Sequence, residues 1–243
     1  MIDIHCHILP MIDDGAASLN EALAMARFCA TDGITHIFAT PHCHKYVHLL
    51  RDTILPHVVL LNEQLKAAEI PVTILPGSEI QVIDANEYRR EFEAGVFCHL
   101  GDGRDFTLLE FNWAREQFPS DAAALVSWIR AQNVIPILAH PERHEYFWKD
   151  PAKLQALVDA GAWVQVTVDS LLGNHGPSPK VAGEAILRQH PDAILATDAH
   201  NMYRCSGMSV GYDWVLEHLG SARSEDLRAR AERVLESCCA KDH

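Results

Sequence analysis

Six short segments of this chain place histidine, aspartate or glutamate at the end of an apolar run. The side chains concerned are His5 and His7, His42, Glu79, Glu110, His140, and Asp198 with His200. Apolar runs of this length indicate strands, and the loops that follow parallel strands converge at the carboxyl end of an α/β barrel. The pattern therefore predicts one polynuclear metal site at one end of such a barrel.

Seven segments have the length and apolar character of buried strands. They cover residues 2–5, 34–39, 72–76, 106–110, 135–139, 163–168 and 193–197. Nearly continuous apolar strands fit a parallel sheet that is buried on both faces. We therefore expect an α/β fold in which seven parallel strands close into a barrel. An open, doubly wound sheet is the alternative, but its two edge strands would have to contribute ligands to one cluster.

Segments with helical periodicity alternate with these strands. Ser18 and Glu21 form a capping-box pattern at the start of the first helix, which ends near residue 32. The further helices are expected near 51–68, 84–93, 120–132, 151–160, 179–190, 208–219 and 224–239. No linker or internal repeat interrupts the sequence. We therefore expect a single domain over 1–243, with the C-terminal helices of 208–239 packed on the barrel.

The composition excludes some classes of protein. The net charge of −13 disfavours nucleic acid as a partner, because phosphate backbones are bound by Lys and Arg. No stretch approaches the roughly 18 apolar residues that a membrane helix requires. Met1 directly precedes the first ligand strand, which leaves no room for a signal peptide. We therefore expect a cytoplasmic protein that does not insert into membranes.

The candidate ligands include more side chains than one ion can use. Residues two apart on a strand point to the same side, so His5 and His7 can hold one ion together. Asp14, in the loop after the first strand, brings the set to five histidines and four carboxylates. Nine side chains suit two or three ions. Imidazole with carboxylate favours Mn, Fe or Zn over Ca or Mg.

The order and spacing of these residues resemble a known family. The matching motifs are His5-x-His7, Thr40-Pro41-His42, Pro76-Gly77-x-Glu79, Leu109-Glu110-Phe111, His140-Pro141-Glu142-Arg143 and Thr197-Asp198-Ala199-His200-Asn201. They are similar to those of the polymerase-and-histidinol-phosphatase (PHP) metallophosphoesterases. Ile12-Asp13-Asp14-Gly15 and residues 165–173 look most like the capsule-type, manganese-dependent bacterial protein-tyrosine phosphatases.

This resemblance implies a distorted (β/α)7 barrel of parallel strands with helices outside. It also implies a division of the ligands among three divalent ions, with Mn expected and Fe or Zn as alternatives. One ion would take His5, His7, Glu79 and Asp198; a second would share Glu79 and add Glu110 and His140; a third would take Asp14, His42 and His200.

The implied reaction is hydrolysis of phosphotyrosine on a bacterial tyrosine kinase linked to capsular or exopolysaccharide synthesis. Metal binding can lower the pKa of water to about 7, so we expect in-line attack by a metal-bridging hydroxide. Arg143 and Arg204 are candidate clamps, since a guanidinium can hold two phosphate oxygens. Glu79 and Asp198 are counted with them as catalytic residues.

Three alternatives remain open from the sequence. A small-molecule phosphatase of the histidinol-phosphate type would use the same ligands. An amidohydrolase also begins with His-x-His on a barrel, although this chain has no Lys at the end of the fourth strand. A non-catalytic metal-binding module is the third. Near the expected mouth, His144 and the loop 174–179 differ from the family pattern, and we interpret His44, His48 and His175 as solvated loop histidines.

Overall fold

Ten strands form the centre of the part of the chain that the computed structural model describes, residues 1–44, 46–112 and 118–239. They are β1 (Ile2–Cys6), β2 (His36–Ala39), β3 (His42–His44), β4 (Val47–His48), β5 (Thr73–Pro76), β6 (Glu79–Val82), β7 (Phe106–Phe111), β8 (Ile135–Leu138), β9 (Trp163–Thr167) and β10 (Ala193–Ala196). Each of the seven predicted strands is present within one or two residues of its expected bounds.

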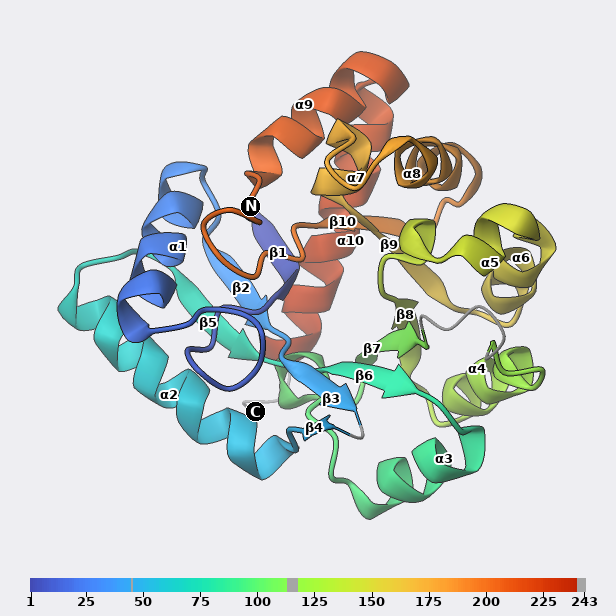
Figure 1. Ribbon diagram of the computed structural model, residues 1–243, viewed down its shortest axis with the longest axis horizontal. Coiled ribbons are helices and arrows are strands. Elements are labelled where there is room, and N and C mark those ends of the chain that lie inside the picture. The colour runs from blue at the N-terminus through green and yellow to red at the C-terminus, as the bar shows by residue number, and fades with distance from the viewer. Residues whose placement is uncertain (45, 113–117, 240–243) are drawn as a thin grey trace.

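Helices surround these strands on the outside (Figure 1). They are α1 (Leu19–Thr31), α2 (Arg51–Ala67), α3 (Ala85–Ala94), α4 (Ala122–Ala131), α5 (Glu145–Lys149), α6 (Pro151–Asp159), α7 (Val168–Leu172), α8 (Pro177–Gln189), α9 (Met208–Leu219) and α10 (Ser221–Cys239), with short 3-10 turns η1 (Leu100–Asp102) and η2 (Pro141–Arg143). The eight predicted helices are confirmed, and α5 and α7 are additional. None of the helices described is long and apolar enough to cross a membrane.

The strands close into a barrel with seven strand positions, which we call walls. Strands β2 and β3 form one wall together, and so do β5 and β6. Strands β1, β2 and β5 pair in that order, and the second sheet runs β10-β9-β8-β7-β6-β3-β4. Apart from the short antiparallel β3–β4 pair, every pairing is parallel. The barrel closes between β1 and β10, where the amide of Asp198 donates to the carbonyl of His5 at 2.9 Å. The predicted parallel α/β barrel is confirmed.

Two walls differ from the prediction because each consists of two consecutive strands. The chain passes from β2 to β3 across Thr40-Pro41 and from β5 to β6 across Gly77-Ser78. A Cβ on Gly77 would lie only 3.0 Å from Leu100 and 3.2 Å from Thr40, so a larger residue there would require these side chains to shift. Proline and glycine at these breaks look like strand ends in the sequence.

The interior of the barrel is filled by side chains that alternate along the strands. Phe106, Leu108 and Glu110 share one face of β7, so two apolar residues lie below the carboxylate that faces the site. The inner apolar cluster comprises Ile2, Ile4, Phe38, Leu100, Phe106, Leu108, Ile137, Ala139, Trp163, Ile194, Ala196, Ala231 and Val234. The last two belong to α10, which passes behind the strands in Figure 1. Helix α10 therefore closes the end of the barrel where the strands begin.

Candidate metal site

The structure brings all nine predicted ligands into one cluster at the end of the barrel opposite α10. Seven of them line a cavity of about 190 Å³ together with Arg143 and Arg204: Asp14, His42, Glu79, Glu110, His140, Asp198 and His200. His5 and His7 are fully buried and contact Glu79 and Asp198. His42 and Glu79 are the first residues of β3 and β6 and are paired in register, instead of following strands as expected.

Four atoms at the base of this cavity are spaced as ligands of a single ion. Nε2 of His5 lies 3.2 Å from Nε2 of His7, 3.4 Å from Oε2 of Glu79 and 3.2 Å from Oδ1 of Asp198. Nε2 of His7 lies 3.4 Å from both carboxylate oxygens. Four tetrahedral ligands about 2.0–2.1 Å from an ion are about 3.3–3.4 Å apart. The spacing therefore fits a bound metal ion.

The tautomer of His5 directs a lone pair into this group. The amide N–H of His140 donates to Oε1 of Gln165 at 3.0 Å, which identifies that atom as the oxygen of the Gln165 amide. Nδ1 of His5, also 3.0 Å from this oxygen, must then carry the proton. Nε2 of His5 consequently has its lone pair facing the two carboxylates, which is the state that binds a metal ion.

Two further histidines are fixed in the same way. Nδ1 of His7 lies 2.7 Å from Oδ2 of Asp13, and Nδ1 of His200 lies 2.9 Å from the carbonyl oxygen of Asp198. Both acceptors require a proton on Nδ1, so Nε2 is the nitrogen of each neutral ring that offers a lone pair to the cluster. Such partners behind the ligands are typical of metal-bound histidines and determine ring orientation.

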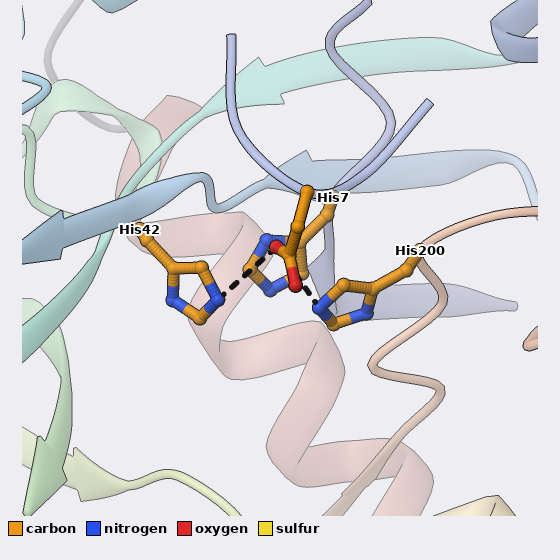
Figure 2. A group of neighbouring side chains, drawn as sticks. His7, His42 and His200 are labelled. Atoms are coloured by element: carbon orange, nitrogen blue, oxygen red, sulfur yellow. Dashed lines mark ion pairs between the residues drawn. The ribbon is translucent and has the colours of Figure 1, made fainter. Parts of the chain in front are cut away.

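Asp14 stands at the outer side of the cluster between two rings. Its Oδ1 lies 3.3 Å from Nε2 of His42 and 3.5 Å from Nε2 of His200. Figure 2 shows His7 between His42 and His200; its ring is stacked on that of His200 and tilted against that of His42. Ligand atoms of these four residues all lie within 4.8 Å of one another. This group could hold an ion nearer to solvent, since the Asp14 side chain is 60% exposed.

The remaining predicted ligands form a third group on the side of β6 and β7. Nε2 of His140 lies 2.7 Å from Oε1 of Glu79 and 3.9 Å from Oε1 of Glu110. Glu110 also accepts a hydrogen bond of 2.9 Å from the amide of Gln81. His144 belongs to this group, because it offers a ligand atom within 4.8 Å of those of Glu110 and His140.

The buried carboxylates of the cluster need positive charge close to them. Within the described residues, Oε2 of Glu79 and Oδ1 of Asp198 are buried without a hydrogen-bond partner. Burial opposes charge on His7, but its contacts with Asp13, Asp198 and Glu79 outweigh burial and raise its pKa well above the usual value. Metal ions can supply this positive charge in place of protons, because metal binding and protonation compete for the same lone pairs.

Both predicted arginines reach the cavity. Nη1 of Arg143 lies 2.5 Å from Oδ2 of Asp198, on the oxygen that does not face His5 and His7. Arg204 lines the same cavity, and its carbonyl accepts a hydrogen bond of 3.2 Å from the amide of His200. Both arginines thus line the cavity together with the candidate ligands, where an anion would meet them.

Two candidate ligands adopt unusual backbone conformations. His140 has φ of 32° and Asp198 has φ of 52°, which is the left-handed region that L-residues seldom occupy. Such conformations cost about 1–3 kcal/mol each and are concentrated at functional sites. Each turns a side chain at the end of a strand, β8 or β10, toward the barrel axis.

Three residues near the cluster were missed as site residues by the sequence reasoning. Asp13 precedes the predicted ligand Asp14, and only the structure shows that it is Asp13 that contacts His7. Gln165 lies within a motif that resembles the family, but a neutral amide inside a strand carries no sign of a metal site. His144 departs from the family pattern, and this departure is the one signal that the sequence offers.

The sequence matches a known family and several named relatives. A family model described as "Capsular polysaccharide synthesis, CpsB/CapC" matches residues 1–236. The tyrosine-protein phosphatase YwqE of Bacillus subtilis is 34% identical, over 97% of this chain and 91% of the relative. The putative tyrosine-protein phosphatase CapC of Staphylococcus aureus is 30% identical, over 83% of this chain and 78% of the relative.

A solved structure shares the whole architecture. It comes from a study of YwqE from Bacillus subtilis and CpsB from Streptococcus pneumoniae, described as unique metal-dependent tyrosine phosphatases. The TM-score is 0.91 at 32% identity, covering 98% of this chain and 95% of the other. The resemblance to the capsule-type phosphatases that the motifs predicted is therefore confirmed. The chain belongs to the CpsB/CapC family of capsular polysaccharide synthesis proteins.

Proposed function

We propose that this protein is a metal-dependent protein-tyrosine phosphatase that uses divalent ions, with three ions bound and Mn as the native metal. One observation carries the proposal: nine metal-type ligands converge at a cavity of about 190 Å³ that two arginines also line. The relatives named tyrosine-protein phosphatases support the same reaction. The proposed unit is a single domain of residues 1–243, supported by the packing of α9 and α10 on the barrel.

The ions would supply two things when bound: a nucleophile generated from water at neutral pH, and neutralisation of charge on the phosphoryl oxygens. His5, His7, Glu79 and Asp198 would hold one ion, with the histidine lone pairs directed by Gln165 and Asp13. The other groups, around Asp14 and around Glu110, would hold the remaining ions. We assign Glu79 and Asp198 a catalytic role as well, because each contacts more than one part of the cluster.

Arg143 and Arg204 would bind the phosphate. Both face the cavity that the ligands line, and a guanidinium can donate two parallel hydrogen bonds to phosphate oxygens. Arg143 already contacts the Asp198 carboxylate. A phosphate bound there would be oriented with its oxygens toward both the arginines and the ligand cluster, which positions the phosphorus for attack.

The physiological substrate we propose is a phosphotyrosine protein, specifically a bacterial tyrosine kinase linked to capsular or exopolysaccharide synthesis. The family description, capsular polysaccharide synthesis, supports this assignment. The cavity is lined by Asp14, whose side chain is 60% exposed, so a side chain presented on a polypeptide could reach it from solvent. A small-molecule phosphatase remains the second candidate, because the same ligands would serve both substrates.

The deciding experiment is phosphatase activity after metal exchange. Chelator-treated protein is reloaded in parallel with Mn, Fe, Zn or Mg and assayed with p-nitrophenyl phosphate and a phosphotyrosine peptide. Hydrolysis of both, restored best by Mn and lost in His42→Ala, is the expected result. Hydrolysis of the small ester alone would assign a small-molecule phosphatase. Inactivity with every metal would contradict the proposed function.

A further inference from the structure

The turn η2 brings His140 and His144 to the same side of the chain. The amide of Arg143 donates to the carbonyl of His140 at 2.9 Å, and the amide of His144 donates to that of Pro141 at 3.1 Å. Residues three or four apart along a helical turn are neighbours on one face. The two imidazole rings are stacked, with their centroids 5.6 Å apart and their planes inclined by 27°. Because His140 lines the ligand cavity, a second imidazole lies directly beside one of the predicted ligands.

A ring nitrogen of His144 lies close to the ligand atoms of two predicted ligands. The ligand atoms of Glu110, His140 and His144 all lie within 4.8 Å of one another, as do those of His5, His7 and Glu79. Two ligands on opposite sides of one ion are about 4.1 Å apart. A contraction of less than about 1 Å would therefore allow Glu110, His140 and His144 to share an ion.

The carboxylate of Glu110 is turned toward this group. Its Oε2 accepts a hydrogen bond of 2.9 Å from the side-chain amide of Gln81, in β6. Its Oε1 lies on the side of His140, 3.9 Å from Nε2 of that ring. This separation is within the span of two ligands of one ion, which is about 4.1 Å at most. Glu110 thus offers Oε1 to an ion, while Gln81 holds the other oxygen.

The ring of His144 is held in the interior of the protein. His144 is 2% exposed. Its ring stacks on that of Tyr146, with 5.1 Å between centroids, and meets the edge of Phe147 at 6.2 Å. A phenyl ring would make similar contacts there, whereas an imidazole also carries nitrogen atoms that can bind a metal ion. The packing therefore fixes a metal-binding ring beside Glu110 and His140.

We propose that His144 is a tenth metal ligand, which binds through one ring nitrogen the divalent ion held by Glu110 and His140. The inference rests on the proposed function, because that ion is one of the three assigned to the cluster. Without His144 the ion would have one imidazole, from His140, and two carboxylates, from Glu79 and Glu110. Imidazole suits Zn and Fe, whereas carboxylate suits Mn, so His144 should raise the affinity of this position for Zn.

Zinc titration of chelator-treated protein tests this assignment. His144→Phe keeps an aromatic ring in the packing and removes both ring nitrogens. Loss of a residue that only supports a ligand typically costs about 10- to 100-fold in metal affinity, so loss of a ligand should cost at least about 100-fold. In titration calorimetry, the variant should show this loss for one of the three zinc ions and wild-type affinity for the other two. The affinity of the same position for Mn should fall less.

His99→Phe is the matched control for this experiment. His99 is also a buried histidine packed against an aromatic ring, with 5.2 Å between its centroid and that of Phe92. It belongs to none of the candidate ligand groups among the described residues. His99→Phe should therefore leave all three zinc affinities unchanged, whatever its melting temperature. Equal zinc affinities in His144→Phe and wild type would show that the His144 ring serves packing alone, and would overturn the inference.

Anomalous diffraction from zinc-soaked crystals of the wild type makes the test independent of how the variant folds. A zinc ion is expected about 2.0–2.1 Å from a ring nitrogen of His144. A zinc ion bound by Glu110 and His140 but not by His144 would overturn the inference.

Both measurements read metal binding, so they are separate from the test of activity. A wild type that hydrolyses the phosphotyrosine peptide, together with wild-type zinc affinities in His144→Phe, would overturn the role of His144 and leave the proposed function intact. Zinc bound by His144 in a protein that hydrolyses no phosphate ester would support the ligand and overturn the proposed function.

Discussion

The carboxylate of Asp13 lies 2.7 Å from Nδ1 of His7 and determines which nitrogen of that ring faces the ligand cluster. The same carboxylate accepts the amide protons of Gly15 and His42, so it joins three parts of the site. A Cβ on Gly15 would overlap the carbonyl oxygen of His7, and only glycine allows this close approach. Asp13 thus supports the site without being one of the nine predicted ligands.

Asp13→Asn should weaken metal binding without removing a predicted ligand. An amide placed opposite Nδ1 of His7 can present N–H there, which favours the tautomer with its proton on Nε2 and blocks that nitrogen. Loss of such a partner typically costs about 10- to 100-fold in metal affinity. Titration calorimetry with Mn on chelator-treated protein measures this change.

Asp32→Asn is the matched control for Asp13→Asn. Asp32 is another aspartate that accepts backbone and hydroxyl hydrogen bonds, from Ser209 at the start of α9, but it does not contact the cluster. This variant should lower the melting temperature while leaving metal affinity unchanged. Equal metal affinity in Asp13→Asn and wild type would show that Asp13 does not control the His7 tautomer.

Gln165→Leu should affect both stability and metal binding. The substitution removes the acceptor of the His140 amide and of Nδ1 of His5, both of which are buried. An unsatisfied buried donor costs about 1–3 kcal/mol, and His5 loses the partner that selects its tautomer. Thermal unfolding and Mn titration measure the two effects.

The exposed Gln155 on α6 provides the comparison for that experiment. Its side chain donates to Asp159 at the surface, so Gln155→Leu should change neither the melting temperature nor metal affinity appreciably. If Gln165→Leu unfolds at a lower temperature but binds Mn as tightly as wild type, Gln165 has only a structural role.

The cluster of candidate ligands was predictable from the sequence because metal chemistry restricts residue type. His140 and Asp198 stand where apolar strands end, and buried charges are costly unless they are paired or bound to metal. Asp13 and Gln165 were not predictable, because they act through contacts that the fold creates. Gln165 is separated from His5 by 160 residues and from His140 by 25. An amide among apolar residues gives no indication of these partners.

The barrel itself followed from the number and spacing of apolar strands, but its broken walls did not. Pro41 and Gly77 stop a strand in most contexts, so the sequence indicated that those strands end there. In the structure the same walls resume with His42 and Glu79, which face each other in register. Tertiary pairing with β7 continues the sheet past the break, and local sequence carries little information about such pairing.

Arg143→Ala should weaken substrate binding and lower turnover while metal content stays intact. Arg143 contacts Asp198 on the oxygen turned away from His5 and His7, so the ligand oxygen keeps its place. Loss of one donor to a developing oxyanion typically costs about 10²–10³-fold. Steady-state kinetics with p-nitrophenyl phosphate and elemental analysis give the two readouts.

Arg188→Ala is the control: this exposed arginine is paired with Glu184, so its loss should leave both turnover and metal content unchanged. Loss of metal in Arg143→Ala would contradict the clamp role.

His190→Gln should reduce the acid sensitivity of the fold. Burial, followed by the charge of Arg223, lowers the pKa of His190 in the folded protein. The unfolded chain binds a proton near pH 6.5 while the folded ring stays neutral, so stability is present above that pH and lost as the pH falls below it. The melting temperature of His190→Gln should therefore decline less than that of wild type between pH 7.5 and about 5.

His218→Gln, at an exposed position of α9, is the control, and its melting temperature should follow the wild-type curve over the same pH range. Parallel curves for His190→Gln and wild type would show that protonation of His190 is not coupled to unfolding.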